Sequence, residues 1–223
     1  VPDVAIVDVV DNQNFAALGM LKELSGDGVN KADFFEGPWS SAQYDGKTYG
    51  LPLNSNNLAL YYNKTMLKEA GVEVPTDWAS LKEAAKKTTK GDVKGLAISA
   101  VKNESGTFQL LPFVWQTGGD MSNFSESGAT ALAYLRGMIE DGSISEAVVN
   151  YTQEDARTQF ITGKAAMMIN GPWELSTLNK EADIEWDVAP LPKGERAATS
   201  MGGENVVVMN GAKQSEAALK LTK

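Results

Sequence analysis

The run Gly163-Lys164-Ala165-Ala166-Met167-Met168-Ile169-Asn170-Gly171-Pro172-Trp173 decides how the chain is organised. Residues 165–169 form an uninterrupted apolar segment, which is typical of a strand. Gly163 ends the preceding helical pattern, and Gly171-Pro172 ends the strand, because glycine and proline interrupt regular structure. The run therefore predicts a strand that leads directly into a turn carrying Trp173.

Short apolar strands and capped helices alternate along the rest of the chain. Val4–Val7 has the composition of a strand covered on both faces of a parallel sheet, and Asp45-Gly46 predicts a hairpin turn. Further strands are expected at 58–62, 187–189 and 206–209, and helices at 15–24, 63–70, 75–85, 129–139 and 152–161. Interleaved strands and helices predict an α/β fold.

The composition excludes several classes of enzyme. The 223 residues include no Cys and no His, and the net charge is −9. Thiolate nucleophiles, imidazole bases and the common zinc ligands are therefore absent, and catalysis would have to use carboxylates, Lys or Tyr. We expect no cofactor and no metal site. A negative chain without a basic stripe also argues against nucleic-acid binding.

Two aromatic side chains are candidates for sugar contacts, because aromatic rings stack on the apolar faces of sugars. Trp173 follows a strand, and open α/β sheets bind ligands where strands end. It fits a ligand contact and a core plug equally well. Phe108 follows Gly106 and precedes an apolar run, so its own context favours core packing.

Polar side chains cluster beside three apolar strands, and such clusters at strand ends suit a shared cleft, although loop polarity explains each of them alone. The clusters comprise Asp8 and Asp11, Asn56, and the run Gly203, Glu204 and Asn205. A carbohydrate-active hydrolase that uses Asp8, Asp11 or Glu204 as paired carboxylates is the alternative function.

The run 163–173 closely resembles the sugar-binding proteins of ABC importers, the extracellular solute-binding family 1 that includes maltodextrin-binding protein. Further matches follow in the family's order at 1–4, 44–52, 60–64, 74–78 and 202–205. The resemblance implies two α/β lobes of the type II periplasmic-binding-protein fold, with the ligand in a cleft between them. It places the first lobe at 1–54 and 205–223, the second lobe at 57–201, and hinges at 55–56 and 202–204.

The resemblance also implies residue roles. Trp173 matches the family's stacking tryptophan, and Phe108 matches an aromatic of the same groove. Asn56 falls where maltodextrin-binding protein has an acidic contact, and the loop with Asp8 and Asp11 lacks the tryptophan found there in maltodextrin binders. The run Gly203-Glu204-Asn205 matches a segment that faces the cleft.

The implied protein is a monomeric binding protein and not an enzyme. It would bind an oligosaccharide outside the cell, as a lipid-anchored or periplasmic protein, and deliver it to the permease subunits of an ABC importer. The family has structure before Pro2 and after Lys223, so we expect a shortened chain that exposes apolar surface and binds ligand weakly or not at all.

Overall fold

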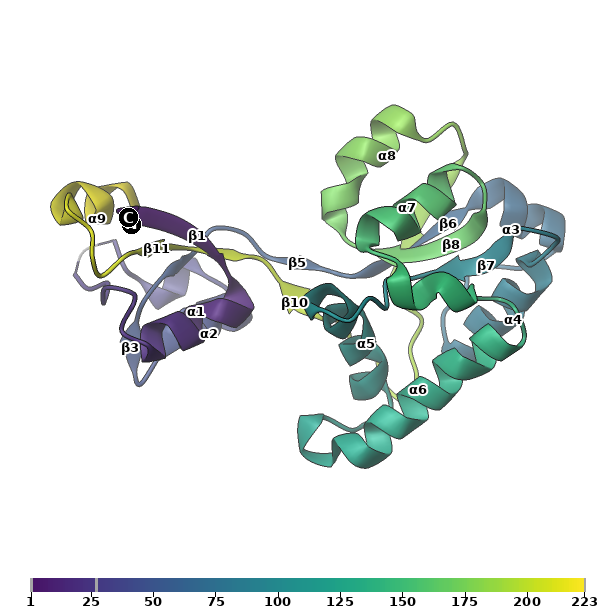
Figure 1. Cartoon of the computed structure of the whole chain (residues 1–223), viewed down its shortest axis with the longest axis horizontal. Coiled ribbons are helices and arrows are strands. Elements are labelled where there is room, and N and C mark those ends of the chain that lie inside the picture. The colour runs from purple at the N-terminus through teal and green to yellow at the C-terminus, as the bar shows by residue number, and fades with distance from the viewer. Residues whose placement is uncertain (1, 27, 223) are drawn as a thin grey trace. The chain divides into compact units, whose positions relative to one another are not determined.

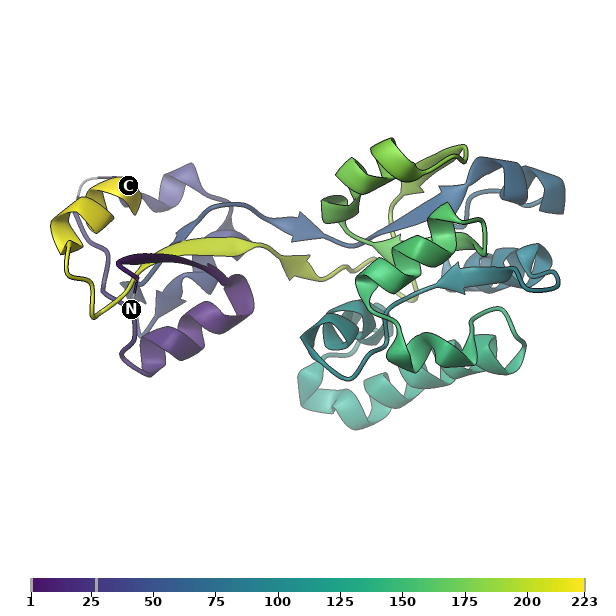
Figure 2. The same cartoon turned by 45° about the horizontal axis from the view of Figure 1, so that its top comes forward.

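The computed structural model describes residues 2–26 and 28–222, so Val1, Asp27 and Lys223 lie outside the described part. The chain forms two compact units (Figures 1 and 2). The first comprises residues 1–56 and 201–223, and the second comprises 57–200. Met201 belongs to the first unit, whereas the predicted second lobe includes it. The chain passes between the units at 56–57 and again at 200–201.

The second unit is built on a four-stranded sheet with the order β7-β8-β6-β9. Strand β8 pairs in parallel with β7 and antiparallel with β6, which also pairs antiparallel with β9. Its strands are β6 (Ala59–Asn63), β7 (Lys94–Ala97), β8 (Ala165–Asn170) and β9 (Trp186–Ala189). Its helices are α3 (Lys64–Ala70), α4 (Trp78–Thr88), α5 (Glu104–Gln116), α6 (Phe124–Glu140), α7 (Gln153–Ile161) and α8 (Leu175–Glu181), with the short 3-10 helices η2 (Met121–Asn123), η3 (Glu146–Asn150) and η4 (Pro172–Glu174).

Alternating side chains of this sheet enter two different cores. Leu60, Met167 and Ile169 pack with residues of α3, α4, α5 and α6. Tyr61 and Met168 point to the other face and pack with residues of α7 and α8, which lie together on one side of the sheet in Figure 1. Helices therefore cover both faces, and every residue of β8 is buried.

Local capping interactions define the ends of helices in this unit. Asn63 accepts a hydrogen bond from the N–H of Met66 at the start of α3, and Gly71 ends that helix with φ of +64°. Thr152 and Asp155 form a capping box at the start of α7, which lies within the helix predicted at 152–161. These contacts satisfy helix-end groups that have no partner within the helix.

The first unit contains a three-stranded antiparallel sheet with the order β1-β11-β4. Its strands are β1 (Val4–Asp8), β4 (Leu51–Pro52) and β11 (Glu204–Val208), with the hairpin of β2 (Gln43–Tyr44) and β3 (Lys47–Thr48). The short pair of β5 (Asn56–Asn57) and β10 (Met201–Gly202) lies at the crossings of the chain, where Asn57 is the first residue of the second unit. Its helices are α1 (Val9–Ala17), η1 (Lys31–Asp33), α2 (Glu36–Ser41) and α9 (Ser215–Thr222). The hairpin forms as predicted, because Asp45 and Gly46 both adopt positive φ.

Two predictions for the first unit are wrong. Strand β1 pairs antiparallel with β11, and Ile6 is 62% exposed, so β1 is not a fully covered strand of a parallel sheet. The helix expected at 15–24 instead spans Val9–Ala17 and ends before Gly19, whose φ is +69°. Leu21 lies beyond that end in a β-bridge with Met209. Leu21, an apolar residue after Gly19, therefore belongs to a β-bridge and not to a helix.

Large apolar side chains are exposed in both units. Phe35 is 83% exposed, Leu221 77% and Leu132 49%. Among the described helices, none combines the length and the apolar character needed to cross a membrane.

Gly95 allows α4 to lie against β7. A Cβ atom at this position would lie 2.0 Å from the backbone oxygen of Ala85 in α4. We expect Gly95→Ala to lower the free energy of unfolding of the second unit by about 2 kcal/mol, because backbone on both sides must move. Urea denaturation followed by tryptophan fluorescence measures this change.

Gly137→Ala in α6 is the matched control. Its Cβ would meet only the mobile Nζ of Lys82, at 3.1 Å, and alanine favours helix. This variant should unfold at the same or a slightly higher urea concentration. Equal destabilisation of both variants would contradict the proposed contact between α4 and β7.

Candidate functional site

Trp173 lies in the turn that leaves β8, and its position depends on the absence of a side chain at Gly171. A Cβ atom at Gly171 would lie 2.1 Å from the indole atoms Cη2 and Cζ3 of Trp173. The indole therefore folds back over the Gly171 backbone. The side chain stays 39% exposed, so it does not plug the core.

The backbone of this turn is fixed by buried hydrogen bonds. The Tyr61 hydroxyl donates to the carbonyl of Gly171 at 2.7 Å. Burial and the nearby Glu174 carboxylate raise the pKa of Tyr61 to about 12, so the hydroxyl stays protonated and able to donate. The Asn170 side chain accepts from the N–H of Gly171 and donates to the carbonyl of Gln153. Hydrogen bonds therefore hold both Asn170 and Gly171 in place.

An ion pair holds the other side of the turn. Glu174 follows Trp173 directly, and its side chain is only 2% exposed. It accepts from Arg157 of α7 at 2.7 Å. Because a buried carboxylate requires a partner, Arg157 ties the turn to α7. The sequence does not predict this pair: Arg157 lies in a predicted helix, and Glu174 directly follows the run 163–173.

Phe108 of α5 is the aromatic neighbour of Trp173. The two ring centroids lie 6.3 Å apart with an angle of 56° between the planes, a common geometry for interacting aromatic rings. Phe108 is half-buried against the core beneath it. The structure thus brings together two predicted site residues that are 65 positions apart in the sequence.

Helix α5 is held in place beside the ends of β7 and β8. Buried Gln109 accepts from the N–H of Ser99, which follows β7, and donates to the carbonyl of Ile169 in β8. The Ser200 hydroxyl donates to the carbonyl of Phe108 at 2.7 Å. Phe108 and Trp173 therefore form a preorganised aromatic pair at the carboxyl ends of two parallel strands.

Three predicted acidic residues lie together in the first unit. Asp8 ends β1 and is the register partner of Glu204 in β11, and Asp11 lies in the first turn of α1. The pKa of Asp8 is raised above its ordinary value. Partial burial is the largest cause, repulsion from Glu204 is the second and repulsion from Asp11 is the third. These carboxylates are close enough to affect one another and could accept hydrogen bonds from hydroxyl groups.

Asn205 does not lie with them at the surface. Side chains alternate along β11, so Asn205 points to the opposite face from Glu204 and is fully buried. It donates to the Ser41 hydroxyl at 3.0 Å. The expected contact between this side chain and a ligand is therefore replaced by a contact inside the first unit.

Gly203 and Asn56 occupy the segments beside the crossings between the units. Gly203 has φ of +127°, and a Cβ there would lie 2.5 Å from the backbone oxygen of Asn54, so this position requires glycine. Its carbonyl accepts from the N–H of Val9 at 3.0 Å. Asn56 belongs to β5 and is partly exposed.

The whole chain, residues 1–223, matches the model of the bacterial extracellular solute-binding protein family. The chain belongs to this family. Three similar proteins are a binding protein of Brucella abortus, a maltooligosaccharide ABC transporter solute-binding lipoprotein of Streptococcus pneumoniae, and the maltose-bound structure of T. maritima MalE3.

The similarity of this solute-binding chain to its relatives extends over most of its length. The Brucella protein is 32% identical over 86% of the chain, and the Streptococcus protein is 30% identical over 99%. MalE3 is 29% identical over 99% of the chain, with a TM-score of 0.88. The chain spans 49% and 54% of the two curated relatives and 61% of MalE3.

These comparisons confirm the predicted family and its α/β fold of two lobes. They give no support to the hydrolase alternative, because the family is one of solute-binding proteins and both curated relatives are named as binding proteins.

Arg157→Met tests whether the ion pair supports the Trp173 turn of the solute-binding chain. Removing Arg157 leaves the buried Glu174 carboxylate without its partner, so the free energy of unfolding should fall by about 3–5 kcal/mol. Arg136→Met is the control, because its pair with Glu140 is exposed (79% and 61%) and should contribute no more than about 0.5 kcal/mol. Chemical denaturation of both variants measures the difference; equal effects would contradict a special role of Arg157.

The acidic cluster predicts a definite order of pKa effects. Glu204→Gln should lower the pKa of Asp8 more than Asp11→Asn does, because repulsion from Glu204 is the larger of the two. Carboxyl-carbon NMR titration of Asp8 measures both. An Asp8 pKa that neither variant changes would show that the carboxylates do not interact.

The raised pKa of Asp8 also determines how the stability of the first unit changes with pH. Ionised Asp8 is less favourable in the folded than in the unfolded protein, so it lowers stability above its folded pKa, and this loss disappears below its ordinary value of 3.8. Asp8→Asn should therefore stabilise the first unit at neutral pH and have little effect at pH below 3.8.

Proposed function

We propose that this chain is the ligand-binding part of an extracellular protein that captures an oligosaccharide for an ABC importer, with one sugar ring stacked on Trp173. The observation that carries the proposal is the exposed indole, held beside Phe108 by a buried network. An aromatic ring suits the apolar face of a pyranose, and rigid placement reduces the entropy lost on binding.

The acidic cluster supports the same function. Carboxylates accept hydrogen bonds from hydroxyl groups, which sugars carry in large number. We assign Asp8, Asp11, Glu204 and Asn56 to hydroxyl recognition. Gly203 sets the backbone next to Glu204, and Asn205 supports β11 from inside the unit.

The relatives' names agree with an oligosaccharide as the ligand. The Streptococcus relative is described as a maltooligosaccharide-binding lipoprotein, and the MalE3 structure contains maltose. We therefore include in the proposal lipid anchoring or a periplasmic location, transfer to permease subunits, and action as a monomer without turnover. Hinges at 55–56 and 202–204 are part of the same proposal, since they adjoin the two crossings of the chain.

Trp173→Ala tests the stacking assignment. Loss of the ring should weaken oligosaccharide binding about tenfold or more, because stacking adds roughly 0.5–1.5 kcal/mol to the burial of the ring. Isothermal titration calorimetry with maltotriose and with a panel of other oligosaccharides, on the original protein and the variant, measures the change.

Phe124→Ala is the matched control, because Phe124 is an aromatic of the same unit with 38% exposure, against 39% for Trp173. It should bind as tightly as the original protein. Gly171→Ala, which displaces the indole, should weaken binding in the same direction as Trp173→Ala. An unchanged dissociation constant for Trp173→Ala would remove Trp173 from the site, and steady release of shortened sugars would contradict a binding protein.

A further inference from the structure

The chain contains two Asn-Gly steps, which lie in contrasting environments. Asn170-Gly171 ends β8 in the second unit, and Asn210-Gly211 follows β11 in the first unit. An asparagine side chain can react with the backbone nitrogen of the next residue, and glycine hinders this reaction least because it has no Cβ atom. The two steps therefore have the same chemistry, and the fold around each determines whether it reacts.

The reaction is deamidation, which needs only water. The backbone nitrogen of the glycine loses its proton and attacks Cγ of the asparagine. A bond forms between these two atoms, the bond from Cγ to Nδ2 breaks, and ammonia leaves with the proton. Water then opens the resulting succinimide ring at either carbonyl, which gives aspartate or isoaspartate. The nitrogen must approach Cγ from outside the plane of the side-chain amide, as nucleophiles approach carbonyl carbons.

Asn170 is held in a geometry that prevents this attack. Its side chain is fully buried. Its Nδ2 donates to the carbonyl of Gln153 at 2.9 Å, and its Oδ1 accepts from the N–H of Gly171 at 3.0 Å. Such a hydrogen bond favours a nitrogen near the amide plane and keeps the proton on it. Burial also excludes the water that the reaction consumes, so Asn170-Gly171 reacts only when the second unit opens.

Asn210 and Gly211 are exposed in the turn between β11 and α9. The backbone N–H of Asn210 donates to the carbonyl of Met20 at 2.7 Å. Among the described residues its side chain has one partner, the carbonyl of Gly19, to which Nδ2 donates at 3.0 Å. A single exposed hydrogen bond is readily exchanged for one to water, so the side chain is able to rotate toward the nitrogen of Gly211.

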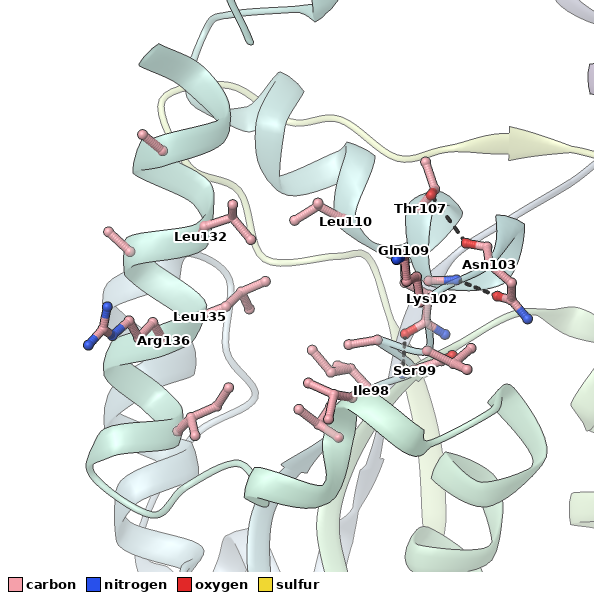
Figure 3. Close-up of a pocket in the computed structure, with 18 residues that line it drawn as sticks. Ile98, Ser99, Lys102, Asn103, Thr107, Gln109, Leu110, Leu132, Leu135 and Arg136 are labelled. Carbon is pink, nitrogen blue, oxygen red and sulfur yellow. Dashed lines mark hydrogen bonds between the residues drawn. The ribbon is translucent and has the colours of Figure 1, made fainter. Parts of the chain in front are cut away.

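Asn103 shows why exposure alone is insufficient. It is exposed, but Glu104 follows it, and a residue with a Cβ atom crowds the attacking nitrogen. Its Oδ1 also accepts from the N–H of Gly106 at 3.3 Å, which caps α5. Figure 3 shows this capping contact where Asn103 lines the groove between α5 and α6. Asn103 is therefore an internal reference for an exposed asparagine that reacts slowly.

The requirements of the reaction are met together at Asn210, because a glycine follows it, the step is exposed and the side chain is weakly held. We propose that Asn210 is a site of spontaneous deamidation, and that the native fold restricts the reaction to this one of the two Asn-Gly steps. The site needs no enzyme and is independent of the proposed sugar contact.

Deamidation changes the contacts of this turn. A carboxylate at position 210 cannot donate to the Gly19 carbonyl, and isoaspartate lengthens the backbone between β11 and α9. Asp3 lies beside the same turn, because its carbonyl accepts from the N–H of Met209 and its carboxylate from that of Gln214. The product therefore loses a hydrogen bond and gains a negative charge near an existing one.

The test is peptide mapping by mass spectrometry during incubation of the 223-residue chain in warm neutral buffer. Electron-transfer fragmentation distinguishes isoaspartate from aspartate. Asn210 should deamidate at least about tenfold faster than Asn170, because the buried step reacts only after the fold opens, and Asn103 should also react more slowly than Asn210. In concentrated urea, which unfolds both units, Asn170 should react as fast as Asn210, whereas Asn103 should stay slow.

Gly211→Val tests the chemistry of the step. A branched side chain crowds the attacking nitrogen, so deamidation of Asn210 should slow about tenfold or more. Lys213→Val is the matched control, because Lys213 is an exposed residue of the same loop and its replacement keeps the Asn-Gly step; the rate should equal that of the original protein. Asn210→Asp reproduces one product and should shift the amide NMR signals of Gly19 and Met20, whereas Lys213→Val should not.

Three outcomes would overturn the proposal. The first is equal rates at Asn170 and Asn210 in the folded chain. The second is no reaction at Asn210 in the folded chain under conditions in which the urea-unfolded chain reacts, and the third is an undiminished rate in Gly211→Val. Unchanged amide signals in Asn210→Asp would contradict the assigned contact with Gly19.

Discussion

The complete burial of β8 is the constraint on which the second unit depends. Each of its six residues is covered, because helices pack on both faces of the sheet and strands pair with both edges of β8. Met167 and Met168 therefore belong to different cores although they are neighbours in sequence. The strand can leave this environment only through a turn whose polar groups are satisfied, which is why Asn170 and Gly171 are so fully hydrogen-bonded.

The turn that follows β8 also determines the positions of Trp173 and Phe108. Gly171 gives the indole of Trp173 its position, and Tyr61 and Arg157 fix the backbone on which the indole is carried. Gln109 connects the same strand to α5, so Phe108 is placed by the same core. The candidate site is thus supported by buried polar contacts.

The second unit was largely predictable because its signals are local. Caps at Asn63 and Thr152 and the apolar run 165–169 indicate their structures without knowledge of distant residues. The first unit was less predictable: whether β1 is parallel or antiparallel depends on its pairing with β11, almost the whole chain away. The burial of Asn205 follows from the pairing register of β11 with β1. The ion pair of Glu174 depends on Arg157 of α7, which lies outside the run 163–173.

The order of segments in the chain has a consequence for synthesis on the ribosome. The second unit is one continuous stretch, whereas the sheet of the first unit joins Val4 to Val208. The second unit can therefore complete its fold while the first remains open, since β11 emerges only after it. Until then β1 lacks its partner, and its exposed Ile6 and unpaired backbone are available to other chains. Early folding of residues 57–200 shortens the effective loop that β1 and β11 must close.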